Sequence, residues 1–226
     1  MGLSKTGFAL TAFFFVLFLT FTILTVTVDV ADTGTGTVGF CDLNNSMRDA
    51  IGTSETWYKI TEAFGFVAVA EAGCFAAAGV ISLIKKKSLL KVEGVFFALA
   101  ATYVLIAVFY AVFEIFPVNY RPFSFSGGSE LEASYPSSHT FVAVTVFLSG
   151  IIAFGRLVKN RILVAVFSAV STLLAVFTAV GRLLSGVHWF TDVIGGLLLG
   201  AALVSFCLMV EEAASGKRKA GETENA

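Results

Sequence analysis

Charged residues are scarce in this chain. Only 14% of its 226 residues are Asp, Glu, Lys or Arg, whereas an ordinary soluble domain has about 25%. The hydrophobic residues make up 57% of the chain, and so apolar a sequence cannot cover its own surface in water. The composition therefore excludes an ordinary soluble protein and indicates residence in a membrane.

Positive charge and cysteine are scarce as well. The formal net charge is −1, so no global basic field points to nucleic acid, and no such partner is expected. Three cysteines without a dense spacing pattern make a disulfide framework improbable. Cys74 and Cys207 lie in apolar runs and are expected to be small buried thiols. No cluster of metal-ligating residues is visible, so neither a metal nor a cofactor is expected.

Six stretches are long and apolar enough to cross a hydrocarbon core, which takes about 20 helical residues. Each is expected to be a helix, because backbone polar groups in lipid must bond within their own segment. Residues 211–226 resemble a short solvated tail. The sequence therefore predicts an all-α, six-span transmembrane helical bundle that forms one domain over residues 1–226. The expected spans lie near residues 7–28, 60–84, 92–116, 139–157, 162–182 and 188–210.

Basic residues are distributed unevenly between the ends of these spans. The N-terminus, the joints after spans two and four, and the C-terminal tail hold 11 of the 15 Lys and Arg residues. The positive-inside rule therefore places both termini in the cytoplasm of a multi-pass plasma membrane protein. The segments 29–56, 117–138 and 183–187 are then expected to face outward, and nothing in residues 29–56 indicates chemistry.

Two of the four outward basic residues lie beside the only two histidines of the chain. Alone, each of these residues would have an ordinary explanation, such as a snorkelling arginine or a helix cap. Their combination at three outward helix ends predicts a shared anion site. The three segments contain Arg121-Pro122, then Pro136-Ser137-Ser138-His139, and then Arg182 with His188 and Asp192.

The chemistry of these side chains suits a phosphate group. The planar guanidiniums of Arg121 and Arg182 match phosphate oxygens, and the start of span four offers free amides to an anion. His188 and Asp192 are four residues apart, so on a helix they share one face. The carboxylate can then bond one imidazole nitrogen and leave the other free to attack, while His139 donates a proton to the leaving alkoxide.

The three segments resemble the signature of the type 2 phosphatidic acid phosphatase (PAP2) superfamily. The matching positions carry the spacing of that signature within residues 114–192, and the six-span layout is usual for its membrane members. Ser138 and Gly181 replace a glycine and a serine of the signature, which are mild departures. The matched residues are Arg121, Pro122, Pro136, Ser137, His139, Arg182, His188 and Asp192.

The resemblance implies a role for each catalytic residue. His188 would attack phosphorus and form a phosphohistidine, Asp192 would orient His188, and His139 would protonate the departing oxygen. The phosphate oxygens would be held by Arg121, Arg182, Ser137 and the amide of Ser138. The resemblance also implies that no metal is required.

Glu114 departs from the signature most, because it stands where the family has a lysine, seven residues before Arg121. Three interpretations are open. Glu114 orients Arg121 or Arg182 through an ion pair, or Lys59 supplies the lost positive charge, or the activity is weak or absent.

The predicted function is that of a lipid phosphate phosphatase at the outer leaflet, acting on a phosphomonoester or a diphosphate among the membrane lipids. By family analogy the candidate substrates are undecaprenyl diphosphate, phosphatidic acid and phosphatidylglycerol phosphate, and the first is favoured. The alternatives are a catalytically silent relative that binds lipid phosphate and a small membrane transporter. The sequence does not predict the oligomeric state, and it leaves the role of Glu71, near the middle of span two, open between packing and a polar path.

Overall fold

The structure is a computed structural model that describes residues 5–32, 34, 36–125 and 132–224, with side chains described as far as Ser215. Helices dominate the described residues, and six of them are long and apolar enough to cross a membrane, as predicted. These six are α1 (Lys5–Thr27), α3 (Glu55–Lys86), α4 (Gly94–Ile115), α5 (Ser138–Leu157), α6 (Arg161–Ser185) and α7 (Phe190–Glu224).

The remaining elements are short. The strands β1 (Ala31–Asp32) and β2 (Thr37–Val38) pair antiparallel, and the helix α2 (Cys41–Ile51) follows them. A 3-10 turn, η1 (Leu89–Lys91), links α3 to α4. The segment 29–56, in which the sequence indicated no chemistry, is thus a small hairpin and a helix.

Local sequence signals set the ends of several helices. The Ser54 hydroxyl accepts a hydrogen bond from the amide of Trp57 at the start of α3, and the Asn160 side chain accepts from the amide of Ile162 at the start of α6. Gly186 ends α6 with a positive φ of 72°. A β-carbon at Gly186 would lie 2.7 Å from the carbonyl oxygen of Gly52, so glycine is required twice over, for the backbone angle and for the close approach.

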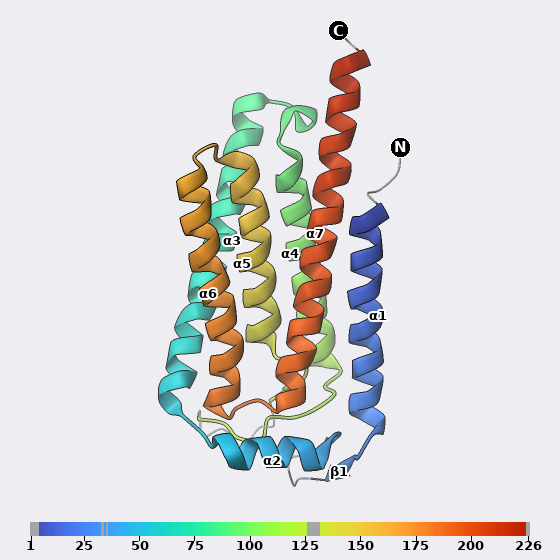
Figure 1. Cartoon of the computed structure of the whole chain (residues 1–226), viewed down its shortest axis with the longest axis vertical. Helices are drawn as coiled ribbons and strands as arrows, with labels where there is room; N and C mark the ends of the chain where they lie inside the picture. The colour runs from blue at the N-terminus through green and yellow to red at the C-terminus, as the bar shows by residue number, and fades with distance from the viewer. Residues whose placement is uncertain (1–4, 33, 35, 126–131, 225–226) are drawn as a thin grey trace.

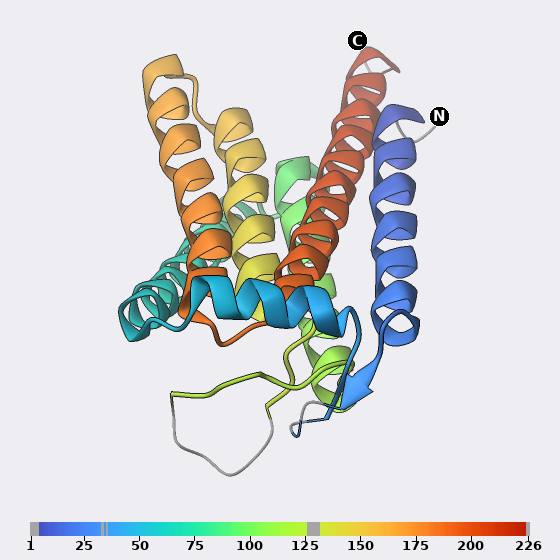
Figure 2. The same cartoon turned by 60° about the horizontal axis from the view of Figure 1, so that its bottom comes forward.

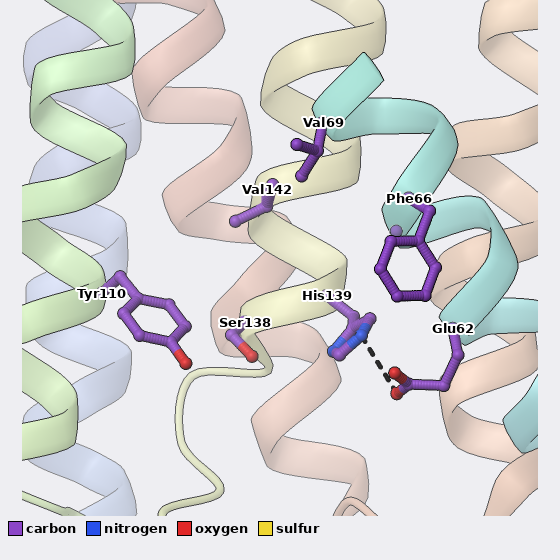
Figure 3. Close-up of a pocket in the computed structure, with 8 residues that line it drawn as sticks. Glu62, Phe66, Val69, Tyr110, Ser138, His139 and Val142 are labelled. Atoms are coloured by element: carbon purple, nitrogen blue, oxygen red, sulfur yellow. Dashed lines mark ion pairs between the residues drawn. The ribbon is translucent and has the colours of Figure 1, made fainter. Parts of the chain in front are cut away.

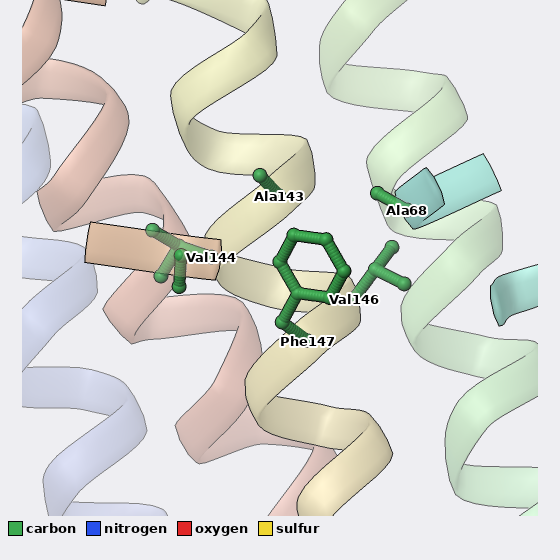
Figure 4. Close-up of a cluster of buried hydrophobic side chains, with 6 residues drawn as sticks. Ala68, Ala143, Val144, Val146 and Phe147 are labelled. Atoms are coloured by element: carbon green, nitrogen blue, oxygen red, sulfur yellow. The ribbon is translucent and has the colours of Figure 1, made fainter. Parts of the chain in front are cut away.

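Helices α5 and α7 form the centre of the bundle (Figure 1). α7 packs against α1, α4 and α5, whereas α5 packs against α3, α6 and α7. One apolar cluster joins α5 to its neighbours α3 and α6, and Figure 4 labels five of its six members. The cluster consists of Ala68, Ala143, Val144, Val146, Phe147 and Ala175.

Helices α3 and α4 follow each other in the chain but make few contacts. Their apolar faces are largely exposed, as expected for helices that meet lipid. Cys74 on α3 is exposed and not buried as expected, whereas Cys207 on α7 is buried. Near the middle of α3, Glu71 reaches α5, where a β-carbon at Gly150 would lie 2.0 Å from its Oε1 atom. Gly150 therefore makes room for this carboxyl group.

The two ends of the bundle differ. Helix α2 lies across one end, and the start of α1 and the end of α7 lie together at the other (Figures 1 and 2). The 3-10 turn η1 and the short joint from α5 to α6 lie at the end with the termini. Together with the helix ends beside them, they hold 7 of the 15 Lys and Arg residues. The three segments with the predicted site residues lie at the α2 end.

Candidate active site

The segment between α4 and α5 folds back on itself and brings two outward segments together. The amide of Arg121 donates to the carbonyl oxygen of Glu132 (3.0 Å), and the amide of Ser134 donates to that of Asn119 (2.9 Å). The indole of Trp189, next to His188, donates to the carbonyl oxygen of Tyr120 (2.9 Å). These bonds place Arg121 and Ser134 beside the turn that joins α6 to α7.

His188 lies in this turn, two residues before α7 begins at Phe190. The prediction that His188 and Asp192 share a helix face is therefore wrong, because only Asp192 belongs to the helix. The Nδ1 atom of His188 lies 3.1 Å from both the hydroxyl and the carbonyl oxygen of Ser134, and 3.7 Å from Oδ2 of Asp192. The serine thus lies closer to the imidazole than the carboxylate does.

Asp192 is fully buried and is held by three donors. Its Oδ2 atom accepts from the Ser134 hydroxyl and from the amide of Trp189 (2.9 Å), and its Oδ1 atom accepts from the Asn119 side chain (3.0 Å). Asp192 therefore reaches His188 through Ser134, in the order Asp192, Ser134, His188.

The imidazole of His188 is kept neutral by its surroundings. Burial lowers its pKa well below the ordinary value, because an imidazolium loses its hydration there, and the guanidiniums of Arg182 and Arg121 repel the positive charge further. The Nε2 atom lies 3.2 Å from Nη2 of Arg182, which donates to it. A neutral imidazole with its Nε2 lone pair facing a guanidinium is the form that a nucleophile needs.

Both arginines have an acidic partner. Nη1 of the fully buried Arg182 lies 3.0 Å from Oε1 of Glu62, and Nη1 of Arg121 lies 2.8 Å from Oε2 of Glu132. The same Oε1 atom of Glu62 lies 3.1 Å from Nε2 of His139. Contacts of 3.0 to 3.2 Å therefore link His139, Glu62, Arg182 and His188 in series. The predicted residues from three segments do converge at one place.

Three further nitrogen atoms at this place are buried and have no hydrogen-bond partner among the described residues. They belong to the cationic or titratable side chains that the sequence singled out: Nε of Arg121, Nε of Arg182 and Nδ1 of His139. Buried donors are almost always paired in folded proteins. The two guanidinium nitrogens are donors suited to bind the oxygen atoms of an anion, and Nδ1 of His139 joins them when its ring is protonated.

A family model described as "PAP2 superfamily" matches residues 91–214, which is more than half of the chain. The chain belongs to the PAP2 superfamily. The matched range contains each of the residues just described except Glu62, which lies on α3.

A solved structure supports the assignment at the level of the fold. The chain is similar to a transmembrane PAP2 type phosphatidylglycerolphosphate phosphatase from Bacillus subtilis, with a TM-score of 0.62 and 13% sequence identity. The similarity covers 93% of this chain and 96% of that one. No curated protein sequence matches the chain.

The PAP2 site opens sideways into a cavity of about 200 Å³ between α3, α4 and α5 (Figure 3). Glu62 and His139 lie at the polar edge of this cavity, and Phe66, Val69 and Val142 form much of its apolar wall. The cavity thus joins the polar residues of the site to the lipid-facing surface of the bundle.

The interpretations of Glu114 and Lys59 do not fit this geometry. Glu114 is exposed at the end of α4 and makes no ion pair with Arg121 or Arg182 in the described part of the chain. Lys59 is also exposed and pairs with Glu55 at 2.8 Å. The acidic partners of the two arginines are Glu62 and Glu132.

Sequence reasoning missed four residues that support the PAP2 site. Ser134 and Asn119 hold Asp192, and Glu62 bridges His139 and Arg182. Asn44 of α2 is buried, and its side chain accepts from the amide of Thr191 (3.2 Å) and donates to the hydroxyl of the same residue (3.0 Å). The only hint in the sequence is that Glu62 is a charged residue near the outer end of an apolar span.

Proposed function

We propose that this PAP2 protein is a membrane lipid phosphatase that hydrolyses a phosphomonoester or diphosphate headgroup through a phosphohistidine at His188. The observation that carries the proposal is the convergence of two histidines and two arginines at the polar edge of a cavity that opens toward lipid. A lipid can remain in the membrane with its chains while its phosphate reaches this edge sideways.

The first step forms a bond between His188 and phosphorus. Nε2 of the neutral imidazole attacks, and the bond from phosphorus to the lipid oxygen breaks. His139 transfers its proton to that oxygen, so the lipid leaves as an alcohol or, from a diphosphate, as a monophosphate. As positive charge develops on His188, its Nδ1 proton is held by Ser134, whose hydroxyl donates to Asp192.

The second step restores the enzyme. Water attacks the phosphohistidine, His139 takes a proton from this water, and His188 leaves as the neutral imidazole with inorganic phosphate as the product. Neither step needs a metal ion, as the family resemblance implies. Activity is therefore expected to persist in the presence of a chelator.

The phosphoryl oxygens need donors that are already in position. Arg182 and Arg121 supply guanidinium groups, and the amide of Ser138 lies in the first turn of α5, where amides have no partner within the helix. Ser137 is buried at the cap of this helix, where its hydroxyl accepts from Thr140 at 2.9 Å. Its own proton is available to a phosphate oxygen.

The orientation in the membrane follows from the basic joints. The end of the bundle with the termini carries most of the Lys and Arg residues, so this end is proposed to be cytoplasmic and the α2 end extracytoplasmic. The phosphatase then acts on lipids of the outer leaflet of the plasma membrane. Undecaprenyl diphosphate is the first substrate to test, because its two directly linked phosphate groups can meet both arginines at once.

The test is phosphate release by the purified full-length protein from undecaprenyl diphosphate, phosphatidic acid and phosphatidylglycerol phosphate. At least one lipid should be hydrolysed, and His188→Gln should lose at least about a thousandfold in kcat, as expected for a missing nucleophile. Brief reaction with a labelled lipid, stopped in alkali, should leave label on His188 in the unaltered protein.

A protein that binds these lipids but releases no phosphate from any of them would be a silent relative, and the proposal would be wrong. Full activity of His188→Gln, with the same melting temperature as the unaltered protein, would reject the phosphohistidine.

A further inference from the structure

Glu62 belongs to a helix that carries none of the signature residues, yet its carboxylate lies at the centre of the site. One oxygen atom, Oε1, accepts from Nη1 of Arg182 at 3.0 Å and lies 3.1 Å from Nε2 of His139. Figure 3 shows the carboxylate facing His139 across the edge of the cavity. A single anionic oxygen thus uses a donor of the phosphate-binding arginine and the nitrogen of the proposed proton donor.

These two donors are also the ones that a substrate needs. A phosphoryl oxygen requires the guanidinium of Arg182, and the leaving oxygen requires the proton of His139. A phosphoryl oxygen cannot reach Nη1 of Arg182, and the leaving oxygen cannot reach Nε2 of His139, while Oε1 of Glu62 lies against both atoms. Nε of Arg182 has no partner among the described residues and stays open to an entering anion. Two anions at this distance would also repel each other strongly. The carboxylate and the phosphate therefore compete for these two nitrogen atoms.

Glu62 has room to leave. Its side chain is 34% exposed and lines the cavity, whereas Arg182 is fully buried. Arg182 has further anchors that stay when Glu62 departs, because Nη1 lies 3.4 Å from the Thr61 hydroxyl and the guanidinium packs over the ring of Tyr58 at 5.3 Å. The donor site can thus remain in place while its acidic partner moves into the open part of the cavity.

We propose that Glu62 is a built-in anion that occupies the phosphate subsite of the resting protein and is displaced by the substrate. The inference rests on the proposed function for the identity of the substrate, but its claim concerns anion binding alone. Glu62 keeps Arg182 and His139 aligned between turnovers, and a phosphate must replace it in order to bond Nη1 of Arg182. It is a positioning residue that sets the affinity for phosphate.

Glu62→Gln removes the charge and keeps the shape. We expect this variant to bind orthovanadate and inorganic phosphate about tenfold more tightly. A factor of this size corresponds to the contribution of one partly exposed charge-assisted hydrogen bond, which the anion no longer has to displace. With a lipid substrate, KM should fall by a similar factor and kcat should change by less than about threefold, because Glu62 is absent from the reacting complex. The measurements are isothermal titration with each anion and steady-state phosphate release.

Two further variants separate this role from others. Glu55→Gln removes the same charge two turns earlier on α3, from a pair with Lys59 outside the site, and should leave anion affinity unchanged. Glu62→Asp keeps the charge, so its anion affinity should stay within about threefold of that of the unaltered protein. Glu62→Asp also tests the inference if Glu62→Gln does not fold. A large gain of anion affinity in Glu62→Asp, which keeps the negative charge, would contradict the displacement of a charge by the phosphate.

Other outcomes would overturn the inference. A fall in kcat with unchanged or weaker anion binding in Glu62→Gln would show that Glu62 stays in the reacting complex and orients His139. An equal gain of anion affinity in Glu55→Gln would show that any loss of negative charge at this end of the bundle has the same effect. Displacement of Glu62 would then not explain the gain. Titration with inorganic phosphate does not depend on turnover, so it tests the inference even if no lipid is hydrolysed.

Discussion

The pair α5 and α7 and the pair α3 and α4 differ in how they are packed. In an apolar stretch of 18 residues in each helix, about half of the residues of the central helices are buried, 56% in α5 and 50% in α7. In the outer helices the buried share is only 11% in α3 and 22% in α4. The central helices begin at the two histidine segments of the candidate site, whereas the outer helices border the cavity. The difference separates the proposed catalytic residues, which lie on well-packed helices, from the proposed lipid entrance, which lies on exposed ones.

The comparison teaches where each kind of function can reside. His188 and Asp192 are held by buried hydrogen bonds that leave little freedom, which suits a step that depends on distance and orientation. Glu62 and Val69 lie on a helix with one face in lipid, where a side chain can move at little cost. Changes at the central helices should therefore alter kcat, and changes at the outer helices should alter KM.

After the loss of His188 itself, the largest effect is expected from Ser134→Ala, beside His188 and Asp192. This change removes the hydroxyl between His188 and Asp192 and leaves the buried carboxylate without one of its donors. We expect kcat to fall by about ten- to a hundredfold, which corresponds to the loss of one hydrogen bond to a charged group. Phosphate release at saturating lipid measures it.

Ser149→Ala is the matched control for Ser134→Ala. Ser149 lies in α5 and is buried like Ser134. Its hydroxyl donates to the carbonyl oxygen of Val146 in the same helix, so kcat of Ser149→Ala should be unchanged. Equal losses in the two variants would show that Ser134 matters for packing alone.

A smaller effect is expected from pH. The pKa of His188 lies well below 6.5, and the nucleophile must be unprotonated, so the acid limb of kcat/KM should lie below pH 6.5. At pH 5.5 an ordinary histidine would have lost about tenfold, whereas this enzyme should keep most of its activity. A pH profile of kcat/KM measures the limb.

Arg121→Gln should move this limb to higher pH, because one of the two repelling guanidiniums is removed and the pKa of His188 rises. Both proteins are compared on one substrate, so that the titration of the substrate itself cancels. A limb at or above pH 6.5 in the unaltered enzyme would contradict a buried, neutral His188.

The smallest effect on the kinetics is expected from a change in the cavity between α3, α4 and α5, which is the proposed entrance for the lipid. Val69→Phe narrows the cavity and should raise KM for a long-chain lipid phosphate about threefold to tenfold, the cost of a modest steric conflict, while a short water-soluble phosphate ester is hydrolysed as before. Val67→Phe is the matched control, because Val67 is exposed on the same helix but does not line the cavity. If both variants behave alike, the lipid does not enter between α3 and α4.

The spacing of motifs predicted much of this site. Arg121, His139, Arg182 and His188 were found because they are the rare polar residues at the outer ends of apolar spans. Of the three interpretations of Glu114, the ion pair with Arg121 or Arg182 is not found in the described part of the chain. Its place in the motif said nothing about the direction of its side chain, and the arginines have partners from elsewhere in the chain.

The residues that sequence reasoning missed act through contacts between distant segments. Glu62 lies 120 positions before Arg182, and Asn44 lies 147 positions before Thr191. Such pairs leave no periodicity or local spacing in the sequence. Ser134 was missed because the hydrogen-bond order Asp192, Ser134, His188 depends on where the segment between α4 and α5 folds back.

The sequence by itself determined the six spans and the location of the candidate site residues at the ends of these spans. The physical reason is that lipid requires long apolar helices with their backbone bonds satisfied internally, so the polar residues are confined to the ends. Only the tertiary structure decided that His188 precedes its helix, that Ser134 lies between the imidazole and Asp192, and that Glu62 occupies the donors of Arg182 and His139. These distances join segments that are far apart in the sequence, so they depend on how the helices pack and on the hydrogen bonds between the segments that connect them.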